Sequence, residues 1–344
     1  MHKKTRRASV AIAVAVIALP IPVAGHHSPA EYDQTTVIEL EGEIVNVYWR
    51  NPHVLLELAT DATDGTAVSW DLEGAAVSSQ RRRGVTPDLV KAGDRVRVAG
   101  FLSTRRDRHM LVEHVLLPSG VELLVGSTRE PRWSETERGS SAWTVDPTKA
   151  MSAEGSGIFR VWSRGPGIWP WYFRELSEYP LTASALAIAA EFDEFEDNPL
   201  LDCTAPGMPA LMGNPYPMEF VAIDGGIELR HEEFDVVRTI HLTEAADGPG
   251  VASTPLGYSI GQWDGESLVV TTSRINWPHF GRMGVPQSEA VEVLERFTVV
   301  EDGERLNYEM AISDPQTLLD TYTWEAHWIW RPGEEVNRYQ CTVD

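Results

Sequence analysis

The sequence has little of three things: cysteine, basic charge and long apolar runs. Only two cysteines, Cys203 and Cys341, occur in 344 residues, and no CxxC spacing suggests zinc. Lysine and arginine number 29 against 51 acidic residues. Such an acidic surface repels nucleic acid and anionic lipid, so neither is an expected partner. After residue 25 no apolar stretch reaches about 18 residues, and we expect no membrane span.

Motifs that would fix a reaction are missing as well. The chain contains no GxSxG elbow or other nucleophile motif, no internal repeat and no low-complexity tract. Function must therefore be argued from the compartment, the domain layout and a few clusters of side chains.

The first 25 residues predict a secretory signal peptide. Four basic side chains within residues 3–7 precede an apolar run over residues 8–19, and small residues lead to Gly25. Cleavage after Gly25 leaves 319 residues with a net charge of −26, enough chain for two domains. We expect a periplasmic or secreted protein. In such a compartment Cys203 and Cys341 are expected to be bridged, and two separate buried thiols are the alternative.

Residues 26–126 have the pattern of a small β domain. Runs of β-branched residues alternate with turns, Asp64-Gly65 is a hairpin signal, and residues 78–90 suit one short helix. The expected strands cover residues 37–40, 44–49, 53–58, 67–72, 95–100 and 109–117. Five or six strands with one helix favour an OB-like barrel over an open sandwich.

Residues 127–175 form a predicted linker rich in Trp, Gly and Pro, much of it docked on the domain that follows. In that second domain, residues 176–344, we expect a helix over residues 181–195 capped by Thr182 or Ser184. Nine strands then predict a larger antiparallel up-and-down barrel of the calycin type, which can enclose an apolar ligand. They cover residues 219–223, 226–232, 236–242, 257–263, 267–273, 290–300, 305–313, 321–330 and 337–341.

Residues 26–125 resemble an uncharacterised bacterial exported family with an HHS…GxV…WxNPH…W…E…GD pattern. The matching residues are His26-His27-Ser28, Tyr32-Asp33, Leu40-Glu41-Gly42, Trp49, Asn51-Pro52-His53, Trp70, Glu73-Gly74, Gly84 and Gly93-Asp94. The second half also resembles exported proteins, through residues 257–270 and the pairs Ser288-Glu289, Glu295-Arg296 and Asp314-Pro315. The resemblance implies compartment and domain layout, not chemistry.

A histidine set gives the first candidate site. Cleavage after Gly25 would make His26 the first residue, with an α-amino group and an imidazole on one residue, and His27 beside it. His53 follows a Pro-fixed turn, and the three together would favour Cu(II), with nickel and zinc behind it. Glu73 or Asp71 could orient one of these imidazoles by hydrogen-bonding the ring nitrogen that does not bind the metal. The alternative is a mobile tail and a histidine that hydrogen-bonds the turn.

His109, Met110 and His114 form a weaker candidate. Their spacing puts the two histidines on opposite faces of a regular strand, so both are interpreted as surface residues. Arg105, Arg106 and Arg108 are interpreted as a solvated loop, and residues 81–83 as a charged turn.

Polar residues of the second barrel form a candidate catalytic set: Arg238, His279, Glu289, Glu295 and Asp314. A histidine with a carboxylate could act as acid and base on a bound ligand. The alternative is that Arg238 and Glu295 form a structural ion pair and that Asp314-Pro315 is a turn.

Aromatic residues supply a candidate pocket: Trp263, Tyr322, Trp324, Trp328 and Trp330. Trp324, Trp328 and Trp330 share one face of a strand, which either lines a cavity or packs the linker.

The leading hypothesis is a two-domain binding protein for an apolar or aromatic small molecule, with a copper site at the mature N-terminus. The alternatives are an enzyme acting on such a molecule and a structural envelope protein.

Overall fold

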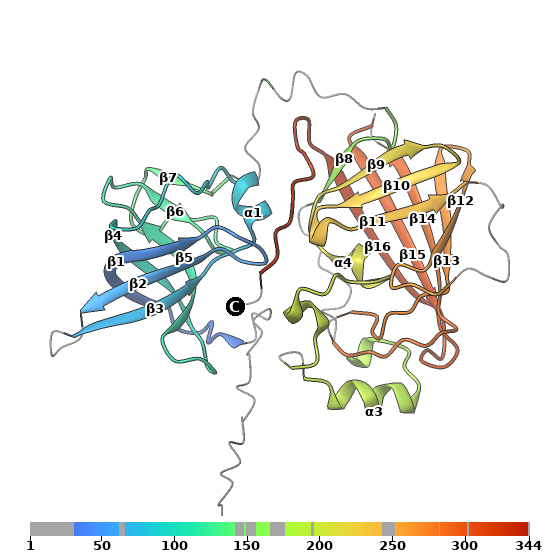
Figure 1. Ribbon diagram of the computed structural model, residues 1–344, viewed down its shortest axis with the longest axis horizontal. Coiled ribbons are helices and arrows are strands. Elements are labelled where there is room, and N and C mark those ends of the chain that lie inside the picture. Colours follow the sequence, from blue (N-terminus) through green and yellow to red (C-terminus); the bar gives the residue numbers. More distant parts are fainter. Residues whose placement is uncertain are drawn as a thin grey trace, which may run out of the picture.

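The computed structural model describes residues 31–61, 66–141, 148, 156–165, 176–193, 196–242, 252–281, 283–300 and 303–342. Two closed β-barrels lie side by side, and the C-terminal segment runs between them (Figure 1). The predicted fold class, a small barrel followed by a larger one, is confirmed. The predicted signal peptide, His26 and His27, and the Asp64-Gly65 turn lie outside the described residues.

The first barrel has the strand arrangement of an OB-fold. Its sheet follows the order β3-β2-β1-β4-β5-β6-β7, and a parallel β3–β5 pairing closes the first five strands into a ring. A short helix, α1 (Val77–Arg82), connects β3 to β4. The strands are β1 (Ile38–Tyr48), β2 (Leu55–Asp61), β3 (Ala67–Glu73), β4 (Arg95–Leu102), β5 (His109–Leu116), β6 (Glu122–Leu124) and β7 (Glu137–Arg138).

One detail of the first barrel differs from the sequence expectation. The strands expected at residues 37–40 and 44–49 are one continuous strand, β1. Gly42 lies within it because the strand crosses β2 closely there: a Cβ would come within 2.2 Å of the Ala59 carbonyl oxygen. The short helix expected within residues 78–90, with a break near Gly84 and Pro87, is α1: it ends at Arg82, and Gly84 follows with a φ of 74°.

The second barrel is a closed ring in the order β10-β11-β12-β13-β14-β15-β16-β8-β9. A ring with an odd number of strands cannot be antiparallel throughout, and here β11 and β12 pair in parallel. The predicted up-and-down pattern is correct for the other neighbours. The strands are β8 (Val161–Arg164), β9 (Met218–Ile223), β10 (Gly226–His231), β11 (Val237–His241), β12 (Tyr258–Asp264), β13 (Ser267–Ser273), β14 (Glu292–Val300), β15 (Arg305–Ser313) and β16 (Tyr322–Trp330).

Part of the expected linker belongs to the two sheets. β7 pairs with β6 at the end of the first sheet, and β8 fills the gap between β16 and β9 in the second barrel. The strand expected at residues 337–341 is not a barrel strand: β8 takes the ninth place, and Cys341 instead makes a single bridge to Asn51 in the first barrel.

Short helices lie outside the barrels. Thr182 caps α3, because its hydroxyl accepts the backbone N–H of Ala185 at 3.2 Å, as the sequence predicts. None of the helices that the structure describes is long and apolar enough to cross a bilayer. The helices are η3 (Leu176–Glu178), α3 (Ala183–Glu191), η4 (Pro199–Asp202), α4 (Ala210–Gly213) and η5 (Glu233–Asp235).

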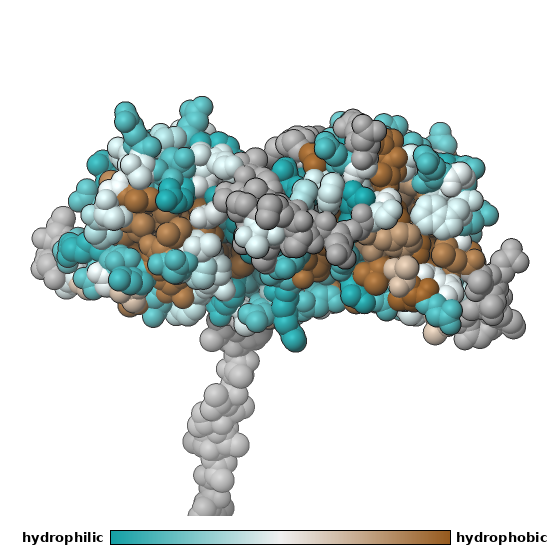
Figure 2. Space-filling model, turned by 90° about the horizontal axis from the view of Figure 1, so that it is seen from above, coloured by the Kyte–Doolittle hydropathy of each residue, from teal (hydrophilic) through white to brown (hydrophobic). Residues whose placement is uncertain are grey.

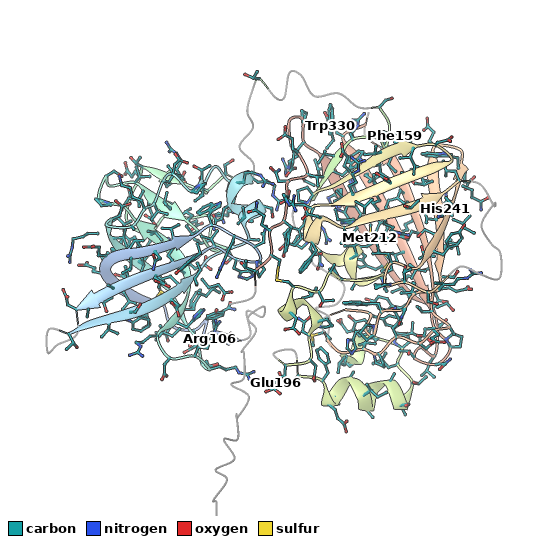
Figure 3. All side chains as sticks on the ribbon, in the orientation of Figure 1. Arg106, Phe159, Glu196, Met212, His241 and Trp330 are labelled. Carbon is teal, nitrogen blue, oxygen red and sulfur yellow. A yellow bond between two sulfur atoms is a disulfide. The ribbon has the colours of Figure 1, made fainter. Side chains whose placement is uncertain are left out.

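Each barrel has its own hydrophobic core. Alternate residues of the strands point inward, so Ile44, Leu58 and Val98 fill the first barrel, and Phe220, Phe297 and Trp328 fill the second. Figure 2 shows a hydrophobic patch on the visible face of each half, with hydrophilic residues around it. In Figure 3, Arg106 lies on the first barrel, while Phe159 and Trp330 lie at one end of the second.

The C-terminal segment, residues 331–342, connects the barrels physically. Cys341 forms the predicted disulfide with Cys203 behind η4, which ties this segment to the second domain. The segment also reaches the first barrel, where the Asn51 side chain donates to the Tyr339 carbonyl and the Thr342 N–H donates to the Asn51 carbonyl at 3.4 Å. Such a cross-link is typical of oxidising compartments, which fits an extracellular or periplasmic location.

Candidate functional site

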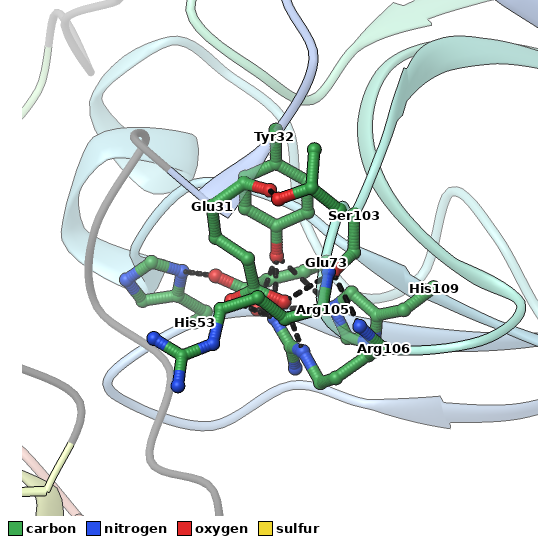
Figure 4. Close-up of polar contacts among 9 residues, drawn as sticks. Glu31, Tyr32, His53, Glu73, Ser103, Arg105, Arg106 and His109 are labelled. Carbon is green, nitrogen blue, oxygen red and sulfur yellow. Dashed lines mark hydrogen bonds and ion pairs between the residues drawn. The ribbon is translucent and has the colours of Figure 1, made fainter.

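A buried carboxylate, Glu73, joins two histidines and a tyrosine on one side of the first barrel (Figure 4). Its Oε1 lies 2.6 Å from Nδ1 of His53. Its Oε2 accepts the Tyr32 hydroxyl at 3.0 Å and lies 3.3 Å from Nε2 of His109. The side chain of Glu73 is 7% exposed, whereas that of His53 is 31% exposed, so the cluster runs from the interior to the surface.

Strand register brings these residues together. Glu73 ends β3 opposite Leu55, two residues after His53. The parallel β3–β5 pairing that closes the barrel places Asp71 opposite His109, on the strand that carries Glu73. The site is therefore a consequence of barrel closure.

Arg106 covers the cluster from the loop before β5. One of its terminal nitrogens, Nη2, lies 2.7 Å from the Tyr32 hydroxyl, 2.8 Å from Glu31 Oε2 and 3.4 Å from Glu73 Oε2. Ser103 also donates to Glu31. Two buried carboxylates thus share one partly buried guanidinium.

These contacts correct two sequence interpretations. Arg106 is not part of a solvated loop, because the buried carboxylates of Glu31 and Glu73 draw its guanidinium inward, although Arg105 and Arg108 are exposed. His109 is not a surface residue: it is 5% exposed, with Nε2 on Tyr32 and Glu73.

The protonation states of the cluster follow from burial and charge. Burial alone would raise the pKa of Glu73, but the neighbouring His53 and His109 hold that pKa well below the usual 4.5. Burial and the adjacent Glu73 carboxylate raise the pKa of Tyr32, so the phenol keeps its proton. The pKa of Glu31 is lowered by Arg106 and Ser103, which outweigh its burial. The site therefore holds two carboxylate anions and neutral Tyr32 at neutral pH.

We expect acid to weaken the first barrel through Glu73. A carboxyl whose pKa is lower in the folded state stabilises the fold above its unfolded pKa, near 4.5, and loses that contribution as pH falls through the folded value. The slope of unfolding free energy against pH below about 4.5 should therefore flatten in Glu73→Gln. Urea unfolding of the wild type and the variant at pH 3, 4, 5 and 7 measures this slope. Equal slopes in the wild type and the variant would contradict this assignment.

His53, of the predicted metal set, lies in this cluster, and Glu73 rather than Asp71 is its carboxylate partner. His26 and His27 lie outside the described residues. Within the described ranges, no group of three or more His, Cys, Asp and Glu side chains is arranged to hold a metal ion. The three-histidine copper site stays a prediction.

His109 and His114 lie on the same face of β5 but contact different residues. A register shift between Ala99 and Gly100 gives β5 an extra residue, Glu113, so His109 and His114 come to the same face. Strict alternation missed this bulge. His114 is nevertheless remote from Glu73 in its contacts, since its Nδ1 lies 2.8 Å from Glu122.

Arg238 and Glu295 form a buried ion pair inside the second barrel. They are 1% and 0% exposed, and the guanidinium meets both carboxylate oxygens. Arg238 also donates to Ser259 at 3.0 Å and to Thr272 at 2.7 Å, while Tyr308 donates to Glu295 at 2.9 Å. The contacts join β11, β12, β13, β14 and β15, as the structural alternative to catalysis predicts.

The other predicted catalytic residues lie elsewhere. Asp314 accepts the N–H and hydroxyl of Ser288 at 2.7 and 2.6 Å and ends β15 in a turn. Glu289 is exposed. His279 lines a small pocket with Trp277 and Asn198, and burial lowers the pKa of its imidazole. None of these three contacts Arg238 or Glu295, so the five residues form no common acid–base site; their catalytic role stays a prediction.

The aromatic face of β16 points into the barrel. Tyr322, Trp324 and Trp328 are buried, and the ring of Tyr308 lies 5.8 Å from Trp324 and 5.1 Å from Trp328. Trp330 packs at the edge of this core, whereas Trp263 is 45% exposed. The inward orientation is confirmed for β16, and the rings fill space against one another. Their role in ligand binding stays a prediction.

Sequence reasoning missed three members of the cluster: Glu31, Tyr32 and Arg106. Tyr32 belongs to the Tyr32-Asp33 pair of the family pattern, a signal that could have identified it. Glu31 and Arg106 carry no local signal, since one precedes any strand and the other lies among exposed arginines.

Comparison with known proteins bears on the first barrel. No curated protein and no solved structure matches the chain. The resemblance to an uncharacterised family is confirmed for the N-terminal part: residues 13–111, which include β1 to β4 and His53, Glu73 and His109, match the model of DUF6152, a family of unknown function.

Proposed function

We propose that the first barrel binds Cu(II) through His53 together with the α-amino group and imidazoles of a mature N-terminus that begins at His26. The observation that carries the proposal is the 2.6 Å contact between Nδ1 of His53 and Glu73. Metal-binding histidines characteristically pair one ring nitrogen with a carboxylate, which fixes the ring and raises the basicity of the other nitrogen. Here that arrangement directs Nε2 to the metal.

Chain connectivity supports the same proposal. Glu31 and Tyr32 bind Arg106 and Glu73 at the cluster, and Glu31 follows His27 by four residues. His26 precedes Glu31 by five residues, and five residues span at most about 18 Å, which bounds how far either histidine can lie from the cluster. A set of nitrogen donors favours copper over the other common divalent metals.

Buried carboxylates lie near the proposed site. Glu31 and Glu73 both contact Arg106, and Glu73 also contacts His53 and His109. A divalent ion at Nε2 of His53 would have these carboxylates in its surroundings without direct coordination by Glu73.

Calorimetric titration of the mature protein with Cu(II), after mass spectrometry of its N-terminus, tests the proposal. Glu73→Gln should weaken binding by about tenfold to a hundredfold, and His53→Ala should weaken it more. His241→Ala removes a histidine that stacks on Tyr258 in the other barrel and serves as the control with unchanged affinity. Absence of tight binding, or tight binding retained in a His26→Ala/His53→Ala variant, would refute the copper site.

A further inference from the structure

Another buried carboxylate lies where the two barrels meet. Glu334 belongs to the C-terminal segment, and its side chain is 3% exposed. Among the residues that the structure describes, neither of its carboxylate oxygens has a hydrogen-bond partner. An ionised carboxylate in this condition has lost its hydration without gaining donors, which disfavours the charged form.

Charged groups face Glu334 from three directions. Arg81 and Arg82 come from α1 in the first barrel, Glu232 from the end of β10, and Arg331 from the same segment. The nearest is Nη1 of Arg82, at 4.0 Å, and that group also donates to the Pro215 carbonyl at 3.5 Å. The guanidinium of Arg81 is paired with the Glu232 carboxylate instead, with Nη2 2.8 Å from Oε2. The arginines therefore attract Glu334 without bonding to it.

The same segment holds the barrels together. Glu232 accepts the N–H of Asn337 at 3.0 Å, and Asp235 accepts that of Tyr339 at 3.1 Å. The ring of Tyr339 packs at a tilt against the ring of Phe234, and the Tyr339 carbonyl oxygen accepts a hydrogen bond from the Asn51 side chain of the first barrel. A change at Glu334 thus acts on the segment to which both barrels bind.

We infer that Glu334 is a proton-operated latch: the barrels stay docked when its carboxyl is protonated and separate more readily when it ionises. Ionisation places a charge that no described donor hydrogen-bonds, and whose nearest cation is Arg82 at 4.0 Å, in the buried contact between α1 and the C-terminal segment. Separation lets water reach that charge. This inference concerns the metal-free protein and does not depend on the copper proposal.

The direction of the pH effect follows from linkage. Burial is the main cause that raises the pKa of Glu334 from 4.5 to about 7 in the docked state. The docked state therefore holds the proton more tightly, and docking weakens as pH rises from the ordinary value through about 7. For one such group the docking equilibrium should fall about twentyfold between pH 5.5 and 7.5.

Single-molecule fluorescence transfer between labels at the exposed positions Lys91 and Glu309 tests the latch on the full chain. The docked fraction of the wild type should fall between pH 5.5 and 7.5, whereas Glu334→Gln should stay docked over that range. Glu334→Leu, which also lacks the charge, should behave alike and keeps the test available if the first variant does not fold.

Glu335→Gln alters the exposed neighbouring carboxylate and should titrate like the wild type. A pH-independent wild type, or a Glu334 variant that opens as the wild type does, would overturn the inference.

Discussion

Arg238→Met should destabilise the second barrel by about 3–5 kcal/mol, because it leaves Glu295 as an unpaired charge in a dry interior. Glu295 is 0% exposed and would keep only the Tyr308 hydroxyl. Typical domains are stable by about 5–15 kcal/mol in total, so the loss would be a large part of the fold's margin. Urea unfolding followed by tryptophan fluorescence measures it.

The double variant Arg238→Met/Glu295→Leu separates the cost of an unpaired charge from the worth of the ion pair. With both charges gone, most of the lost stability should return. A residual cost of about 1–3 kcal/mol is expected, because the Tyr308 hydroxyl loses its acceptor in the core. If the double variant were as unstable as Arg238→Met, the pair itself would be the stabilising element, contrary to this interpretation.

Local patterns in the sequence were enough to predict both barrels. The alternation along β16 predicts that Trp324, Trp328 and Trp330 share a face, and of the two orientations left open the structure shows the inward one, with Trp324 and Trp328 buried and Trp330 partly buried. Thr182 predicts the start of α3 because its cap is a local hydrogen bond. The alternation of apolar residues and the capping of a helix are properties of short stretches of sequence. They can therefore be predicted without knowing which strands and helices pack together.

Other features depend on contacts between distant residues. β8 is short and lies in a Trp-rich stretch, and it becomes a strand because β16 and β9 leave a gap for it. The bulge at Glu113 reverses the face of His114, which strict alternation cannot anticipate. Arg106 and Arg105 are neighbours in one loop, yet Arg106 is partly buried against Glu31 and Glu73 whereas Arg105 is exposed.

The candidate site shows the same division. His53 and Glu73 could be chosen from the sequence because the proline turn and the carboxylate are both among the residues on which the predicted resemblance rests. Their pairing with Tyr32, Arg106 and His109 arises from the parallel β3–β5 closure. That closure joins strands separated by a helix and by β4, so no local signal specifies it.

Removing the Cys203–Cys341 cross-link should lower the free energy of unfolding of the second domain by up to about 5 kcal/mol. The bond closes a loop of 138 residues, and in the chain-entropy model a loop of that length strongly restricts the unfolded chain. The loss has a second component, since Cys341 holds the C-terminal segment against Asn51. Urea unfolding of Cys203→Ala/Cys341→Ala measures the sum.

The two components can be separated by comparing the domains. The entropic part acts on the second barrel alone, so its unfolding midpoint should fall while that of the first barrel changes little. Release of the segment acts on the contact between barrels, and should appear in the labelled protein as a smaller docked fraction at pH 5.5, where Glu334 is mostly protonated in the docked state. Reduction of the wild type with dithiothreitol should reproduce both effects. Unchanged stability after the cysteines are replaced would mean that the folded contacts of residues 331–342, chiefly Tyr339 against Phe234 and Tyr216, hold the segment without the covalent bond.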